Sequence, residues 1–251
     1  MTRNLLLPIC LIASAAFGQR PDPDQLKTSK GNLTIQPILH GTVVLQWNDK
    51  TIYVDPYGGA KAFKGIKAPD MVLITDIHGD HLNAETLGAV DMSNAIIMAP
   101  QAVVDQLDEK LKPKAIVLGN GKNASKLGVT INAIPMYNLP EDADSRHTKG
   151  RGNGYILDLG GKKVYFSGDT EDIPEMRSLS GIDVAFICMN LPYTMDIDQA
   201  ASAVLEFKPK IVYPYHYRGQ GGLNDVEAFK KLVNEGNKSI EVRLRNWYPE
   251  Y

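Results

Sequence analysis

The order of β-type and helical segments repeats once along the 251 residues of the chain, and this repeat restricts the fold more than any single motif. Each half begins with short runs typical of antiparallel strands and continues with apolar runs and helical stretches. The predicted strands span residues 33–39, 42–47, 51–54, 71–75, 95–99, 115–118, 129–136, 154–159, 163–167, 183–189 and 211–215. Helices are expected at 84–90, 102–111, 197–207 and 225–235. Two sheets, each with helices on one face, predict the α/β class and a four-layer α/β/β/α sandwich.

Two of the expected helices carry start signals. Asp196 precedes Gln199 by three residues, and Asn224 stands in the same relation to Glu227. This spacing is typical of a capping box, in which two side chains bond reciprocally to backbone N–H groups of the first turn. We therefore expect the two helices to begin directly after Asp196 and Asn224.

The first eighteen residues have the composition of a secretory signal peptide. Arg3 is followed by an apolar stretch over residues 5–16 and by the small-residue site at 16–18. Because the apolar stretch is too short to span a bilayer, no stable membrane insertion is expected after cleavage. We predict a signal peptide at 1–18, a flexible tether at 19–30 and a single domain at 31–251, in a secreted or periplasmic protein.

The composition limits the classes of binding partner that the protein is expected to have. The chain has 27 Lys and Arg against 29 Asp and Glu, a net charge of -2, without the basic excess of a nucleic-acid-binding protein. Loss of Cys10 with the signal peptide leaves Cys188 as the only thiol, so no internal disulfide can stabilise an exported chain. A small molecule is the expected partner, and the sequence indicates no particular oligomeric state.

Four side chains that can bind a metal ion directly follow the apolar strand predicted at 71–75. They are Asp76, His78, Asp80 and His81. The carboxyl ends of strands are where α/β sheets place their sites. Carboxylates and imidazoles packed this closely are costly to desolvate unless a cation binds them. A metal site is therefore predicted here, and a loop of solvated polar residues is the alternative.

Three further residues of ligand type also follow predicted strands. Asp55 follows 51–54, Asp169 follows 163–167, and His216 follows 211–215. Taken singly, each is typical of a turn or a cap. Because all three share the setting of the cluster at 76–81, the sequence indicates one common site.

With these residues in this order, the chain resembles the metallo-β-lactamase-fold hydrolases, whose motif is His-x-His-x-Asp-His, a downstream His, a bridging Asp and a C-terminal His. The segments 54–56, 149–155, 168–170 and 193–195 resemble more closely the branch related to ascorbate-phosphate lactonases. The resemblance implies an exported metal-dependent hydrolase. In such enzymes a hydroxide held by two divalent ions cleaves an ester, lactone, amide or phosphoester.

The resemblance also implies a ligand set for the second metal ion. Asp80, His81 and His216 would hold this ion, and Asp169 would bridge both ions. Asp55 would fix the loop of residues 76–81. Asp80 would also orient the hydroxide, which makes it the expected catalytic residue. Zn²⁺ is the expected ion at both positions, with Mn²⁺ or Fe²⁺ as alternatives.

The chain departs from the family motif at the first metal ion. His78 and Asp76 match two ligand positions, but Asp76 stands where the motif has a histidine. Its extra carboxylate favours harder ions such as manganese or iron, or else its shorter side chain fails to reach the metal. The third ligand is expected at His147, nine residues after Asn138, which occupies the usual ligand position. A solvent-facing His147 is the alternative.

Substrate contacts are expected from Tyr193, Tyr217 and Arg218, which follow strand ends on the same side as the ligands. The cationic side chain of Arg218 beside a metal centre would suit a phosphate or carboxylate substrate. The alternative is that Arg218 is a solvated surface residue. His40 lies in a predicted turn and is expected to be structural, with a position lining the cleft as the alternative.

Two other functions stay open. Iron-dependent oxidoreductases share this fold, and iron content together with oxygen consumption distinguishes them from hydrolases. A non-catalytic metal-binding relative with a damaged first site would explain Asp76. The complete second set of ligands argues against that alternative.

Overall fold

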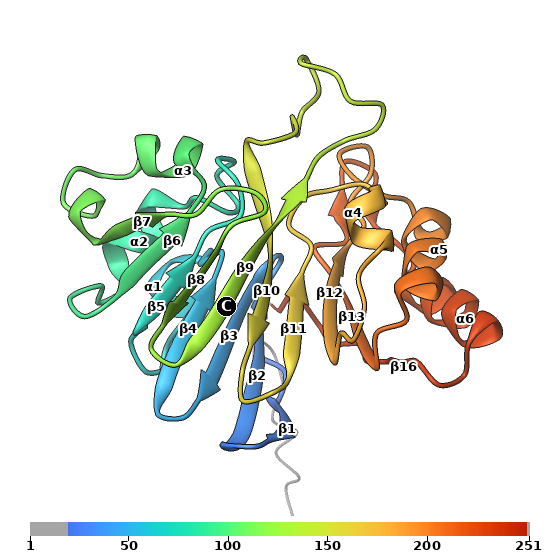
Figure 1. Cartoon of the computed structure of the whole chain (residues 1–251), viewed down its shortest axis with the longest axis horizontal. Coiled ribbons are helices and arrows are strands. Elements are labelled where there is room, and N and C mark those ends of the chain that lie inside the picture. Colours follow the sequence, from blue (N-terminus) through green and yellow to red (C-terminus); the bar gives the residue numbers. More distant parts are fainter. Residues whose placement is uncertain (1–19, 250–251) are drawn as a thin grey trace, which may run out of the picture.

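The computed structural model describes residues 20–249, so the predicted signal peptide lies outside the described part of the chain. Two seven-stranded sheets form the centre of the molecule (Figure 1). The first contains, in order, β1 (Asp24–Thr28), β2 (Gly31–Leu39), β3 (Thr42–Trp47), β4 (Lys50–Val54), β5 (Met71–Leu73), β6 (Ile96–Ala99) and β7 (Ala115–Val117). The second has the order β16 (Glu241–Val242), β13 (Ile211–Tyr215), β12 (Val184–Cys188), β11 (Lys163–Phe166), β10 (Gly152–Asp158), β9 (Val129–Met136) and β8 (Asn123–Lys126).

Each sheet is antiparallel in its first half and parallel in its second. Strands β1 to β4 pair antiparallel, and β4 to β7 pair parallel. The second sheet repeats this scheme, antiparallel from β8 to β11 and parallel from β11 through β12 and β13 to β16. The predicted duplication is therefore confirmed, and the two halves place the carboxyl ends of their parallel strands around one site.

Short helices cover the outer face of each sheet. Helices α1 (Gly59–Ala62), α2 (Ala84–Ala89) and α3 (Gln101–Gln106), with the 3₁₀ turn η1 (Lys112–Lys114), belong to the first half. Helices α4 (Pro174–Arg177), α5 (Ile197–Phe207) and α6 (Val226–Gly236) belong to the second, and α2 and α6 lie on opposite sides of the molecule in Figure 1. A small hairpin of β14 (Arg218–Gly219) and β15 (Gly222–Leu223) follows β13.

Alternation along the strands separates the two faces of a sheet. On β3, Val43 and Leu45 join the core shared by the two sheets, whereas Val44 packs with Phe63 and Leu87 in a second core under the first set of helices. Successive side chains of a strand point to opposite faces, so one run of apolar residues fills both cores. The four-layer α/β/β/α sandwich is therefore confirmed.

The predicted flexible tether at 19–30 is wrong for most of its length. All five residues of β1 pair with β2, and Asp24 binds the guanidinium of Arg245, with Nε–Oδ2 and NH2–Oδ1 distances of 3.0 and 2.6 Å. Arg20 also donates to the carbonyl oxygens of Ala62 and Lys64. The prolines and charges of this segment indicated a tether, but the segment forms a hairpin with β2 and also contacts residues that are remote in sequence.

Two details of the helices also differ from the expectation. The capping box of Asp196 and Gln199 is present, but the cap of α6 is Asp225, which accepts from the N–H groups of Glu227 and Ala228. Asn224 instead donates to the carbonyl oxygen of Met189. The helix expected at 102–111 ends at Gln106 and is followed by η1.

No helix within residues 20–249 has both the length and the apolar character needed to cross a membrane.

Candidate metal centre

The loop after β5 carries four of the predicted ligands in a fixed turn. The N–H groups of His81 and Leu82 both donate to the carbonyl oxygen of His78, at 2.9 and 2.8 Å. Asn83 then caps α2 through its side chain. The loop therefore begins at a buried strand and ends at a capped helix, which fixes both of its ends.

Asp55 braces this loop from the neighbouring strand β4. Its Oδ1 accepts from the Thr75 N–H at 2.7 Å, and its Oδ2 accepts from the Thr75 hydroxyl at 2.6 Å. The same Oδ2 lies 2.8 Å from His81 Nδ1. Asp55 is fully buried, so this contact orients the His81 ring with Nε2 toward the centre of the cluster. The structure thus places Asp55 in the position that the resemblance implies.

Asp76, His78 and His147 form the first group of converging ligand atoms. His78 Nδ1 lies 2.6 Å and His147 Nε2 3.9 Å from Asp76 Oδ2. His147 is fully buried, and both its backbone N–H and its Nδ1 face Asn138 Oδ1, at 2.9 and 3.1 Å. Asn138 therefore orients His147 from the position where the family motif would have a ligand.

His81, Asp169 and His216 form the second group. His81 Nε2 lies 3.3 Å from Asp169 Oδ2, and His216 Nε2 lies 3.4 Å from Asp169 Oδ1. His147 Nε2, from the first group, lies 3.4 Å from Asp169 Oδ2. Asp169 therefore contacts both groups, as a bridging carboxylate must.

Electrostatics and missing partners both favour cations in this cluster. Burial acts to raise the pKa of the Asp169 carboxyl, but the imidazoles of His216 and His81 outweigh it and hold this pKa well below its usual range. His78 Nδ1, His147 Nε2 and Asp169 Oδ1 are buried and lie close to other ligand atoms, but none of the three makes a hydrogen bond of normal geometry with a described residue. Leaving such atoms unpaired is costly. Divalent cations would bind these nitrogen and carboxylate atoms, so the donor set fits a metal centre.

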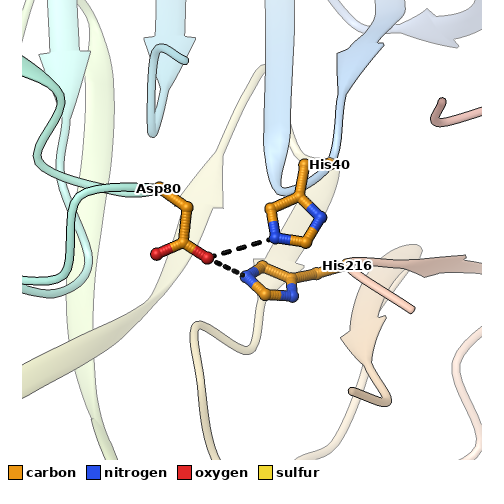
Figure 2. A group of neighbouring side chains, drawn as sticks. All are labelled: His40, Asp80 and His216. Atoms are coloured by element: carbon orange, nitrogen blue, oxygen red, sulfur yellow. Dashed lines mark hydrogen bonds and ion pairs between the residues drawn. The ribbon is translucent and has the colours of Figure 1, made fainter. Parts of the chain in front are cut away.

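His40 also belongs to the cluster, which corrects the expectation that it is structural. It follows β2, and its Nε2 lies 3.1 Å from Asp80 Oδ2, the atom that lies 3.2 Å from His216 Nε2 (Figure 2). Burial, and then the charge of His216, lower the pKa of His40 to about 4. The ring is therefore neutral at pH 7. A histidine before a glycine at a strand end was the only signal in the sequence.

Arg151 is a second residue that the sequence did not indicate. Its Nε donates to Asp76 Oδ1 at 3.2 Å, and its NH2 donates to Asp76 Oδ2 at 3.1 Å. Burial acts to raise the pKa of Asp76, but His78, His81 and Arg151 outweigh it and lower this pKa. The carboxylate that replaces a motif histidine is thus ionised and paired.

The predicted substrate residues have different positions. Tyr193 lies near His147, since its carbonyl oxygen accepts from Asn138 Nδ2 at 2.8 Å. Arg218 is exposed and stacks 4.0 Å from the ring centroid of Tyr248. Tyr217 is buried, and its hydroxyl donates to the carbonyl oxygen of Arg245 rather than toward the cluster. The side chain of Tyr217 therefore packs into the core, and its expected role in substrate contact stays a prediction.

The fold and the cluster together define a metal-dependent hydrolase of the metallo-β-lactamase fold. Residues 34–216 match the family model described as the beta-lactamase superfamily domain, and the chain belongs to this family.

Relatives make the assignment more specific. A UPF0173 metal-dependent hydrolase from Pyrococcus abyssi is 31% identical over 204 residues, which cover 77% of this chain and 89% of the relative. A metal-dependent hydrolase from Parabacteroides distasonis, known from a crystal structure, is 39% identical with a TM-score of 0.78, and the match covers 91% of this chain and 99% of that chain. Igni18, a metallo hydrolase from Ignicoccus hospitalis, is 26% identical with a TM-score of 0.72 and covers 87% and 96%. The narrower resemblance to ascorbate-phosphate lactonases stays a prediction.

Proposed function

We propose that this metal-dependent hydrolase is exported, binds two divalent cations and cleaves an ester, lactone, amide or phosphoester. The observation that carries the proposal is the position of Asp169 between two groups of ligand atoms, within 3.4 Å of His147, His81 and His216. A carboxylate whose two oxygens face ligand atoms of both groups can serve as a bridge between two cations. Zn²⁺ is the expected ion, since imidazoles are the most numerous ligands.

The ligands divide between the two cations. Asp76, His78 and His147 would hold the first, and His81, His216 and Asp80 the second. When bound, the cations would supply a water that is acidic enough to be nucleophilic near neutral pH and a Lewis acid for the substrate oxygen.

Asp80 would take part in the reaction as a hydrogen-bond acceptor. Burial acts to raise the pKa of its carboxyl, but His81, His216 and His40 outweigh burial and lower this pKa far below its usual range. Asp80 is therefore ionised at neutral pH and cannot act as a general acid. It can accept a hydrogen bond from an attacking water and so aim the water's lone pair at the substrate.

We expect the substrate to carry an anionic group, because two exposed arginines lie close in sequence to His147 and His216. Arg146 and Arg218 are exposed, and each stacks on an aromatic ring, Tyr193 and Tyr248 respectively. Stacking holds a guanidinium in place while its N–H groups stay available, which suits a phosphate or a carboxylate.

Metal analysis and a substrate screen test the proposal together. Purified protein should contain two equivalents of divalent metal per chain. It should hydrolyse at least one member of a panel of lactones, phosphodiesters, carboxylic esters and β-lactams. A chelator should abolish this activity, and Zn²⁺ or Mn²⁺ should restore it. One equivalent of metal or fewer, or activity that survives complete metal removal, would contradict the proposal.

Export is tested separately. The mature protein from the native host should begin at or near Gln19, which Edman degradation or mass spectrometry of the N-terminal peptide will show. An intact Met1 on protein recovered outside the cytoplasm would contradict it.

An iron-dependent oxidoreductase is the second candidate, because the group of Asp76, His78 and His147 offers two imidazoles and one carboxylate, a set that also suits non-haem Fe(II). Stoichiometric iron in the purified protein, with oxygen consumed in proportion to substrate, would favour it over hydrolysis.

A further inference from the structure

Asp76, the residue that departs from the family motif, is fully buried and held by a guanidinium. Arg151 binds both of its oxygens, with Nε–Oδ1 and NH2–Oδ2 distances of 3.2 and 3.1 Å. His78 Nδ1 lies 2.6 Å from Asp76 Oδ2, yet this nitrogen has no hydrogen-bond partner among the described residues. The carboxylate therefore faces Arg151 with both oxygens and the first group of ligands with Oδ2.

The backbone sets the position of Arg151 relative to Asp76. At the start of β10, the Asn153 N–H donates to the Thr75 carbonyl oxygen at 2.9 Å. The Arg151 N–H donates to the carbonyl oxygen of Thr148 at 3.2 Å, which closes a turn. Because Thr75 precedes Asp76 directly, the main-chain bond to β10 places the guanidinium against the carboxylate.

We infer that Asp76 and Arg151 together replace the histidine of the family motif. The carboxylate would supply an oxygen ligand to the first cation, and the guanidinium orients that carboxylate and cancels its charge. A neutral imidazole also contributes no net charge, so the pair preserves the charge at the first cation. Arg151 is thus a positioning residue, and the inference rests on the proposed function because it requires Asp76 to contact the first cation.

This pairing changes what the aspartate does to the metal. The extra negative charge of Asp76 is no longer an argument for a harder ion, because Arg151 lies against the same carboxylate. It also predicts that Asp76→His alone will not improve the site. In that variant the guanidinium would lose its carboxylate and lie beside a divalent cation, which repels it.

A double-mutant cycle tests the inference. Wild type, Arg151→Gln, Asp76→His and the double variant are stripped of metal and titrated with Zn²⁺ against a chromophoric chelator. In the Asp76→His background, Arg151→Gln should tighten Zn²⁺ binding about tenfold, because it removes an unpaired positive charge. In the native background the same change should not tighten binding, because it also releases Asp76. An equal effect in both backgrounds would overturn the inference.

Charge and shape are separated by Arg151→Lys, which keeps the charge but not the planar fork. Placed together with Asp76→His, it should leave Zn²⁺ binding as weak as in Asp76→His alone. Recovery with Lys as well as with Gln would overturn the charge argument. Arg245→Gln is the matched control, since Arg245 makes a similar bidentate pair with Asp24. It should leave both Zn²⁺ affinities within about twofold of wild type.

Folding and the proposed function have their own readouts. Melting curves of the metal-free proteins report folding. If Asp76→His does not fold, the inference is tested with variants that keep Asp76. They are loaded with Co²⁺, and their absorption bands are compared with those of wild type. Arg151→Gln should then shift the bands and Arg245→Gln should not, whereas an unchanged Arg151→Gln spectrum would overturn the inference. A wild type that binds fewer than two ions contradicts the proposed function itself. If wild type binds two ions but the effects of the Asp76 and Arg151 substitutions on Zn²⁺ affinity are additive, only the role of Arg151 is contradicted.

Discussion

The imidazole rings of His40 and His216 lie 3.8 Å apart between centroids. The backbone N–H of His216 also donates to the backbone carbonyl oxygen of His40 at 3.1 Å. Gly41 makes this approach possible, because a Cβ atom there would lie 2.9 Å from His216 Cδ2. Both rings direct Nε2 to the same oxygen of Asp80 (Figure 2). His40 therefore shares a carboxylate with His216, a proposed ligand that is distant from it in sequence.

His40 should orient Asp80 through a directed chain of hydrogen bonds. The Arg218 N–H donates to the Tyr248 hydroxyl at 2.8 Å, and this oxygen lies 2.9 Å from His40 Nδ1. If the hydroxyl donates to Nδ1, then Nε2–H donates to Asp80. We expect His40→Ala to lower kcat by about tenfold or more. His40→Gln, whose amide can still donate, should recover part of the loss in steady-state assays. Equal kcat for His40→Ala and wild type would contradict this role.

Asp169→Ala removes the carboxylate that contacts both groups of ligands. We expect metal content to fall below one equivalent and hydrolysis to fall by about two orders of magnitude or more. Because bound metal stabilises the folded state, wild type should melt at a lower temperature after chelation, whereas the variant should be insensitive to the chelator. Elemental analysis and thermal melts with and without chelator check this. A variant with two bound ions and wild-type activity would show that Asp169 is a loop residue only.

Asp55→Asn should weaken the binding of the second cation without unfolding the protein. The change removes the negative charge that faces His81 Nδ1 but keeps an oxygen that can accept from the Thr75 N–H. Loss of such a supporting carboxylate lowers metal affinity by about tenfold to a hundredfold. Asp70→Asn is the control, since Asp70 accepts from the Thr51 N–H at 2.8 Å in the same sheet. Zn²⁺ titration of the two variants should separate them, and equal affinities would contradict the role of Asp55.

Asp183 should make stability depend on pH in the acid range. Burial acts to raise its pKa, but Lys210, the Lys163 N–H and Lys162 outweigh it, so the pKa lies below the ordinary value of 3.8. A carboxyl whose pKa is lower in the folded state stabilises the fold above the unfolded pKa, and this contribution is lost as pH falls through the folded pKa. We expect Asp183→Asn to lower the free energy of unfolding by about 1 kcal/mol at pH 7, and by less below pH 3.8. Urea unfolding at both pH values measures this, with the exposed Asp22→Asn as control. A cost that grows at low pH would contradict the sign.

The sequence indicated the elements that local patterns define. The strand at Thr42–Trp47, the helix at Ile197–Phe207 and the strand at Ile211–Tyr215 have the predicted bounds. Side-chain alternation and capping residues act within a few positions of the chain, so they can be recognised without a structure. Strand β1 was missed because its identity comes from pairing with β2 and from the contact of Asp24 with Arg245.

The same distinction applies to the site. Asp76, His78, Asp80, His81, Asp169 and His216 could be named from the sequence, because each follows a recognisable buried strand and parallel strands end at one edge of a sheet. Only the tertiary structure placed His40 against Asp80, joined Arg151 to Asp76 and turned Tyr217 away from the cluster. These side chains carry no local pattern that distinguishes them from surface or core residues. Their roles depend on contacts between segments distant in sequence, and packing of the two halves of the fold decides those contacts.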